Sequence, residues 1–220
     1  VGEGETVSGI VCTPDNETKD APVCLIVAHG AANDMHEPMI KKVCEGLSRE
    51  NIVTLRFNFL YREKGKKSPD PQARLEKTWE SVHEFFTKSL KPGCKTLVLA
   101  GKSMGGRVVS QMVSSSRIEA DGLILLGYPL HAPGKKEALR DAHLYEVDIP
   151  LLFVEGTRDT LCDLSLLRGV LENLNTTWDL MTIEGGDHSF RVPGRMGISQ
   201  EKVYGSVLEK CRDWIAANFE

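Results

Sequence analysis

The stretch Leu97-Val-Leu-Ala-Gly-Lys-Ser-Met-Gly-Gly-Arg107 predicts the centre of the fold. An apolar run over 96–100 leads into Gly101-Lys-Ser-Met-Gly105, and an apolar-periodic stretch follows over 108–113. This pattern indicates a strand, a tight turn and a helix, with Ser103 at the tip of the turn. A serine at such a tip has strained backbone angles, and a Cβ on either flanking glycine would collide with the neighbouring strand or helix. The stretch therefore predicts a hydroxyl that is held clear of a sheet, in front of a helix N-terminus.

The G-x-S-x-G pattern is short enough to arise by chance, so its interpretation depends on the rest of the chain. An alternative is an ordinary glycine-rich turn between a strand and a helix that cradles a phosphate. The stretch has neither the spacing of a P-loop nor the G-x-G-x-x-G pattern of a dinucleotide site. We therefore favour a nucleophilic serine at position 103.

Length and composition predict a single globular domain over residues 1–220. Apolar residues make up 41% of the chain and charged residues 26%, and the net charge of −4 gives no sign of a nucleic-acid partner. No apolar run approaches the length of about 18 residues that suggests a membrane helix, and no signal-peptide pattern is visible. Six cysteines are scattered without a C-x-x-C motif, which argues for a reducing compartment, cytoplasmic or nuclear, and against a metal site.

Apolar runs alternate with stretches of helical periodicity along the chain. The run at 23–28 is continuously apolar, which is typical of a strand covered on both faces. Expected strands lie at 6–12, 23–28, 52–57, 96–100, 122–127, 150–155 and 178–183, and expected helices at 38–50, 71–90, 164–174 and 200–218, besides the one after Ser103. The helix at 71–90 is expected to turn five side chains inward: Leu75, Trp79, Val82, Phe85 and Phe86.

This alternation predicts an α/β fold with a mostly parallel sheet of about seven strands and helices on both faces. Only a short segment separates the strand that ends at 127 from the strand that begins near 151, which is too little for a large lid. In such a sheet, sites form beyond the carboxyl ends of the strands. The residues that follow each strand are therefore candidates for a functional site.

Three of these residues have the chemistry of a nucleophilic triad. Ser103 follows the strand at 96–100, Asp159 follows the strand at 150–155, and His188 follows the strand at 178–183. A nucleophilic serine needs a base within hydrogen-bond reach, and the base needs an acceptor that fixes its tautomer. The chain order Ser, Asp, His is that of an α/β-hydrolase. We predict that these three residues are catalytic.

Other residues are candidates for two of these roles. Asp163 is a rival acid, but we expect it to cap the helix at 164–174. His131 and His29 are rival bases, although we expect His29 to be a structural histidine that holds its own loop.

Two backbone N–H groups are expected to bind an oxyanion. The first is that of Met104, directly after the nucleophile at the start of the helix. The second should come from the loop after the strand at 23–28, where Ala31 is our choice and Ala32 the second.

His29-Gly30, the G-x-S-x-G pattern at 101–105, Gly156-Thr-Arg-Asp159 and Asp187-His188 together resemble the α/β-hydrolase superfamily over essentially the whole chain. The closer resemblance is to the small dienelactone-hydrolase-like branch of that superfamily. Three longer motifs narrow it further: Arg56-Phe-Asn-Phe with the basic loop after it, Gly101-Lys-Ser-Met-Gly-Gly-Arg107, and Tyr128-Pro-Leu-His-Ala-Pro-Gly-Lys135 with Leu139-Arg-Asp141. Within that branch these motifs are similar to the family of testis-expressed protein 30 and subunit 3 of the non-specific-lethal histone acetyltransferase complex.

The resemblance implies a serine triad, no cofactor and no settled substrate. Because one relative resembles a complex subunit, it also implies an alternative function as a non-catalytic binding or complex subunit with a protein partner. Two features depart from the relatives. The loop His29-Gly-Ala-Ala-Asn33 lacks the glycine-rich oxyanion loop of lipases, and Ser103 stands where dienelactone hydrolases proper use a cysteine.

The sequence therefore predicts a carboxylesterase-like serine hydrolase that acts on a small acyl ester or thioester. The basic run at 64–67 is expected to be a solvated loop rather than a nucleic-acid site. Arg107 has two interpretations, a position at the site or a surface pair with an acidic neighbour. Substrate selectivity is expected to rest on side chains near the strand ends, with core packing as the alternative for the two phenylalanines: Phe59, Leu60, Tyr61, Leu130, His131 and Phe190.

Overall fold

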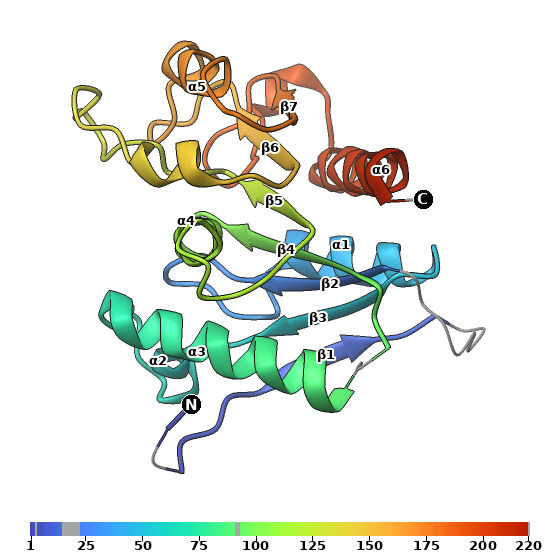
Figure 1. Ribbon diagram of the computed structural model, residues 1–220. Coiled ribbons are helices and arrows are strands. Elements are labelled where there is room, and N and C mark those ends of the chain that lie inside the picture. The colour runs from blue at the N-terminus through green and yellow to red at the C-terminus, as the bar shows by residue number, and fades with distance from the viewer. Residues whose placement is uncertain (3, 15–22, 91–92, 220) are drawn as a thin grey trace.

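The carboxyl ends of the parallel strands meet at one edge of a single sheet (Figure 1). The structure is a computed structural model that describes residues 1–2, 4–14, 23–90 and 93–219. Within these ranges seven strands lie in the order β1-β3-β2-β4-β5-β6-β7, and β1 pairs antiparallel with β3 while the other pairings are parallel. The strands are β1 (Gly9–Cys12), β2 (Val23–Ala28), β3 (Val53–Phe57), β4 (Thr96–Lys102), β5 (Gly122–Leu126), β6 (Leu151–Gly156) and β7 (Trp178–Ile183). The predicted mostly parallel α/β sheet is confirmed.

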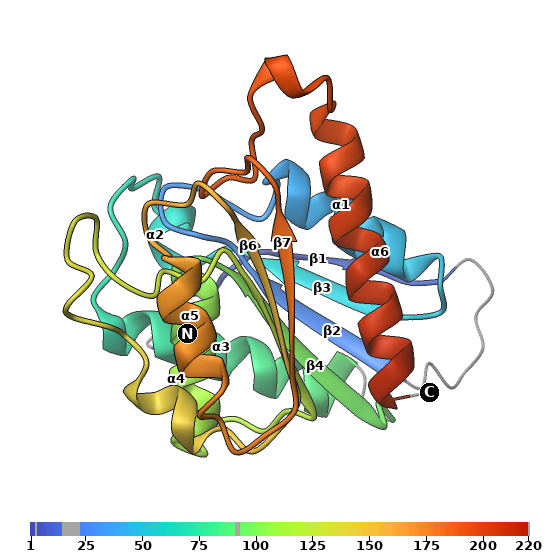
Figure 2. The ribbon, with the colours of Figure 1, turned by 90° about the horizontal axis from the view of Figure 1, so that it is seen from above.

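Helices cover both faces of this sheet, as predicted (Figures 1 and 2). One face carries α1 (Pro38–Ser48) and α6 (Gln200–Phe219), which pack against each other. The other face carries α3 (Gln72–Phe85), α4 (Met104–Ser114) and α5 (Leu164–Leu171). Short helical turns complete the chain: α2 (Leu60–Glu63) and the 3-10 turns Ala142–Glu146 and Gly194–Met196. Every residue of β2 is buried, because helices cover that central strand from both sides.

Local signals in the sequence account for two of the helix starts. Pro38 occupies the first turn of α1, and the Glu37 carboxylate accepts a hydrogen bond from Ile40 N at 2.9 Å. At α5 the Asp163 carboxylate accepts from Ser165 N and Leu166 N, at 3.0 and 3.3 Å. The prediction that Asp163 caps this helix is confirmed.

The predicted helix at 71–90 is interrupted near its end. Regular α3 stops at Phe85, and a π-helical turn, Phe86–Leu90, follows. Phe86 is buried as predicted, but Phe85 is 56% exposed, so the prediction that it faces inward is wrong. Adjacent residues of a helix point about 100° apart, and the buried stripe is already completed by Phe86, one turn after Val82. The segment between β5 and β6 contains only the 3-10 turn Ala142–Glu146 as regular structure, in line with the expected absence of a large lid.

Candidate active site

Ser103 lies on a sharp turn between β4 and α4 that only closely packed glycines allow. Its backbone angles are φ 51° and ψ −114°, a region that side-chain-bearing residues rarely adopt. An added Cβ on Gly101 would lie 2.2 Å from Gly106 N, and one on Gly105 would lie 2.6 Å from the backbone oxygen of His29. The predicted reason for these glycines is therefore confirmed: the strand and the helix touch backbone to backbone beneath the serine.

The structure brings Ser103, His188 and Asp159 together in one hydrogen-bonded line. His188 Nε2 lies 2.8 Å from Ser103 Oγ, and His188 Nδ1 lies 2.6 Å from Asp159 Oδ2. The Asp159 side chain is fully buried, and its second oxygen accepts a hydrogen bond from Leu161 N at 2.7 Å. With Asp159 Oδ2 as the acceptor for Nδ1–H, Nε2 is the basic nitrogen that faces the serine. This arrangement can accept the hydroxyl proton when Ser103 attacks a carbonyl.

The rival bases are engaged elsewhere. His29 is fully buried, its Nε2 accepts from Phe59 N at 3.1 Å, and its Nδ1 lies 2.8 Å from the Gly30 carbonyl. Burial lowers the pKa of His29 to about 4, so the ring is neutral near pH 7. His131 Nε2 similarly accepts from Asp163 N at 3.0 Å. The expectation that His29 holds its own loop is confirmed by these contacts.

The loop that follows β2 lies beside the serine, as the oxyanion prediction requires. An added Cβ on Gly30 would lie 3.4 Å from Ser103 Cβ. The next residue, Ala31, is exposed, and Met104 begins α4, where the first backbone N–H groups have no partner within the helix. The Tyr61 hydroxyl donates a hydrogen bond to the Gly30 carbonyl at 3.4 Å and so helps to fix the position of the loop after β2. The oxyanion roles of Ala31 and Met104 stay predictions, and their placement is compatible with them.

The side chains predicted to contact substrate lie instead in the core. Phe59, Tyr61, Leu130 and Phe190 are 0% exposed, and Leu60 and His131 are 1% exposed. Phe59 packs edge-on against His29 with ring centroids 5.1 Å apart, and burial raises the pKa of Tyr61 to about 12. His131 nevertheless lines a pocket of about 560 Å³ that Asp159 also lines. The burial of the other five argues against the predicted role, because a side chain sealed from solvent offers a substrate no surface. For the phenylalanines, core packing, the alternative to substrate contact, is what the structure supports.

Arg107 is half-buried, and its hydrogen bonds go to neutral side chains. Its guanidinium donates to the amide oxygens of Gln72 and Gln111, each at 3.2 Å, and so joins α3 to α4. Burial lowers the pKa of Arg107. Arg107 therefore joins two helices, an arrangement that matches neither of the two interpretations left open by the sequence.

Two buried ionisable residues near the triad were missed by the sequence-based prediction. Lys102 is 5% exposed and donates to the backbone oxygen of His188, and Glu155 is 0% exposed and accepts from Tyr128 N. Burial and the nearby Asp159 raise the pKa of Glu155 well above its usual range, whereas burial lowers the pKa of Lys102. The signal was available: each charged residue ends an otherwise apolar run, where a buried strand would be expected to continue.

The described residues contain neither a cluster of metal-ligating side chains nor a membrane-spanning helix. Its histidine, cysteine and acidic side chains form no group of three or more that could hold a metal ion. No helix in the described ranges is both long and apolar enough to cross a membrane.

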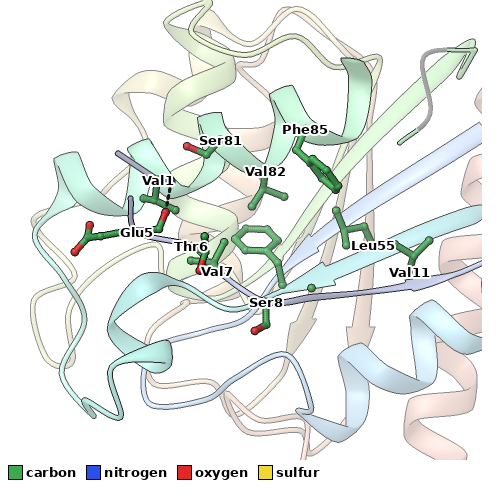
Figure 3. Close-up of a pocket in the computed structure, with 12 residues that line it drawn as sticks. Val1, Glu5, Thr6, Val7, Ser8, Val11, Leu55, Ser81, Val82 and Phe85 are labelled. Carbon is green, nitrogen blue, oxygen red and sulfur yellow. Dashed lines mark hydrogen bonds between the residues drawn. The ribbon is translucent and has the colours of Figure 1, made fainter. Parts of the chain in front are cut away.

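An apolar pocket of about 450 Å³ lies apart from the triad, between α3 and the edge of the sheet (Figure 3). Val7, Leu55 and Val82 contribute to its walls, and none of the triad residues lines it. Phe85, which the sequence wrongly placed in the core, also lines this pocket.

Fold and site together define an α/β hydrolase. The sheet is mostly parallel, Ser103 lies on the strained turn between a strand and a helix that is called the nucleophile elbow, and Asp159 and His188 follow later strands. The chain belongs to the family described as the alpha/beta hydrolase domain, whose model matches residues 21–216.

Solved structures with the same fold include three from bacteria. The dienelactone hydrolase from Anabaena variabilis ATCC 29413 is 19% identical, with a TM-score of 0.74, over 99% of this chain and 94% of that one. The esterase 2 from Thermogutta terrifontis is 14% identical, with a TM-score of 0.77, over 98% and 91%. XC6422 from Xanthomonas campestris, described as a serine hydrolase without lid, is 23% identical, with a TM-score of 0.71, over 94% and 89%. At these identities the likeness shows the fold.

Proposed function

We propose that the protein is a serine hydrolase that cleaves a small acyl ester or thioester through an acyl-enzyme on Ser103. One observation carries the proposal: Ser103 Oγ, both nitrogens of His188 and Asp159 Oδ2 are joined by hydrogen bonds of 2.8 and 2.6 Å. A serine with a purely structural role requires neither a positive φ nor a neighbouring histidine that is hydrogen-bonded to a buried carboxylate, and Ser103 has both. Esterase and hydrolase relatives of the same fold are consistent with this chemistry.

The reaction proceeds in two balanced steps. Ser103 Oγ attacks the carbonyl carbon while His188 Nε2 takes its proton, and the tetrahedral intermediate expels the alcohol or thiol, which leaves with that proton. Water then attacks the acyl-serine, His188 again accepts and returns the proton, and the carboxylic acid is released. Asp159 keeps Nδ1 protonated and stabilises the imidazolium. The Met104 and Ala31 N–H groups bind the oxyanion, a contribution of about 3 kcal/mol per donor in comparable enzymes.

Labelling with a fluorophosphonate tests this proposal, because the probe reacts with an activated serine and needs no knowledge of the substrate. We expect the wild type to be labelled and Ser103→Ala and His188→Ala to remain unlabelled, with a panel of acyl esters and thioesters then defining the acyl group. Absence of labelling in folded wild-type protein would contradict the proposal. The remaining function would then be a non-catalytic binding or complex subunit, and partner capture would be the next experiment.

We further propose that the protein acts in the cytoplasm or nucleus on a small-molecule acyl substrate, without a nucleic acid or a membrane as partner. The scattered cysteines and the net charge of −4 support this placement. We also propose that the protein belongs to the family of testis-expressed protein 30 and the non-specific-lethal complex subunit. Membership of that family would imply a protein partner. Fluorescence localisation of the tagged protein in cells tests the compartment.

A further inference from the structure

Lys102 is a buried lysine that directly precedes the candidate nucleophile. It is the last residue of β4 and is 5% exposed. Burying an ammonium group costs free energy because it loses its hydration. Burial accordingly lowers the pKa of Lys102, while the carboxylates that favour its charged form, Glu155 and Asp159 foremost, act on it through space. A methionine would fill the same space without that cost, so the ammonium needs a reason.

The contacts of the Lys102 ammonium explain why a charged side chain is buried here. Lys102 Nζ donates a hydrogen bond to the backbone oxygen of His188 at 2.5 Å. It also lies 4.8 Å from the centroid of the Phe190 ring. Both partners belong to the loop after β7 that carries the candidate base. A residue on the strand of Ser103 thus holds the loop of His188.

The sheet leaves a space for this contact at the end of β5. Gly127 has a φ of +62°, and an added Cβ there would lie 2.3 Å from Lys102 Nζ and 3.3 Å from the His188 oxygen. Strand β5 runs between β4 and β6, so this gap lies between the strand of the serine and the strand that leads to Asp159. Gly127 therefore leaves room for the Lys102 ammonium, as Gly101 and Gly105 leave room for the close backbone contacts around Ser103.

Within the described residues, the backbone–backbone hydrogen bonds of the His188 loop do not connect it to β4. Asp187 N donates to the Arg191 oxygen at 3.0 Å, and Phe190 N donates to the Asp187 oxygen at 2.8 Å, so the loop closes on itself. Arg158 N donates to the Gly186 oxygen at 2.8 Å and ties the loop to the segment after β6, which carries Asp159. These bonds fix the position of the His188 backbone relative to the segment that carries Asp159. The hydrogen bond from Lys102 fixes its position relative to Ser103.

We propose that Lys102 is a positioning residue whose ammonium fixes the backbone of His188 so that the imidazole stays within hydrogen-bond reach of Ser103. The proposal rests on the proposed function for its catalytic consequence, but its geometric content concerns His188 alone. Removing the ammonium lets the loop drift from β4, which lengthens the contact of His188 Nε2 with Ser103 Oγ and alters the geometry of the hydrogen bond from Nδ1–H to Asp159. The result is a slower attack by Ser103 with little change in the affinity for substrate.

The test compares Lys102→Met with Lys88→Met, which removes a lysine whose side chain is 73% exposed. The first readout is the proton NMR signal of His188 Nδ1–H, which lies far downfield in a hydrogen bond to a buried carboxylate and is assigned by its absence in His188→Gln. The second is the rate of fluorophosphonate labelling per folded molecule, followed by kcat and KM once a substrate is known. Thermal unfolding of each variant accompanies both.

We expect Lys102→Met to unfold at the same or a higher temperature than the wild type, to shift the His188 signal, and to lower the labelling rate and kcat more than tenfold with KM changed less than threefold. Lys88→Met should match the wild type in every readout. If Lys102→Met does not fold, Lys102→Gln tests the same contact with a shorter polar side chain and should move both readouts in the same direction.

An unmoved His188 signal in folded Lys102→Met or Lys102→Gln overturns the proposal, whatever the labelling does. Where the wild type is labelled, an unchanged labelling rate in those variants overturns it too. If the signal moves but neither wild type nor variant is labelled, the positioning of His188 by Lys102 stands and the proposed hydrolase activity fails.

Discussion

The Cα of Gly105 lies so close to the backbone of His29 that an added Cβ would be 2.6 Å from its carbonyl oxygen and 2.8 Å from that of Ala28. The first turn of α4 thereby rests directly on the end of β2. Because the loop that carries the predicted oxyanion donor Ala31 begins at this point, the same contact brings that loop close to the candidate nucleophile. Several changes in this region should have effects whose sign the geometry decides.

Gly105→Ala should destabilise the fold by about 3 kcal/mol, because the methyl group meets backbone atoms that cannot move aside. Gly205→Ala is the matched control, since Gly205 lies in α6 with nothing within 4 Å of an added Cβ. That change should stabilise the protein by about 1 kcal/mol through helix propensity. Chemical denaturation measures both, and equal effects of the two substitutions would contradict the close contact at Gly105.

Substitutions of Ser103 should invert the usual ranking of alanine and glycine. Alanine keeps the positive φ of 51° strained, whereas glycine adopts it without strain. We expect Ser103→Gly to be about 1 kcal/mol more stable than Ser103→Ala, with both variants inactive towards a fluorophosphonate. Urea denaturation gives the comparison, and an alanine variant as stable as the glycine variant would show that the elbow is not strained.

Asp159→Asn should lower turnover on the order of 10³-fold or more without unfolding the protein, because an amide no longer fixes the His188 tautomer or stabilises its imidazolium. Asp163→Asn is the internal control. Its carboxylate caps α5 instead of facing His188, so we expect turnover to be retained and at most about 1 kcal/mol of stability to be lost. Steady-state kinetics on an active ester separates the two aspartates, and loss of activity on changing Asp163 would reassign the acid.

Stability should fall as the pH falls from about 6.5 towards 4, in part through His29. Its folded pKa is lowered to about 4 because the ring is buried, so in this window the unfolded chain binds a proton that the folded protein does not. The difference approaches about 2 to 3 kcal/mol near pH 4.5. Urea denaturation over this range should give a shallower pH dependence for His29→Asn than for the wild type, whereas a change at the exposed His36, His36→Asn, should leave the slope intact.

Phe85 and Phe86 should differ in their effect on stability although they are adjacent. Phe86→Ala removes a fully buried ring and should cost about 3 to 5 kcal/mol. Phe85→Ala removes a ring that is 56% exposed and should cost less than about 1 kcal/mol. Thermal unfolding of the two variants locates the end of regular α3, and similar losses would indicate that both rings face the core.

The sequence by itself determined the layout of the sheet and the candidate triad. Alternating apolar runs specify buried strands, and parallel strands bring their carboxyl ends to one edge, so Ser103, Asp159 and His188, which each follow a strand, could be predicted to lie at the same edge. The spacing of Gly101 and Gly105 specified the elbow because only glycine tolerates that approach. These are local or topological constraints, and one chain suffices to read them.

Only the tertiary structure decided what each side chain touches. Phe59 and Phe190 stand beside strand ends and look available to a substrate in the sequence, yet the packing of distant segments seals both. Lys102 looks like an ordinary residue of a turn, but its ammonium contacts a carbonyl 86 positions away, through a gap left by Gly127 on a third strand. The pattern of polar and apolar residues indicates the periodicity and the burial of a segment. Which atoms come into contact depends on how segments far apart in the chain pack, and on whether the local backbone angles leave space for them.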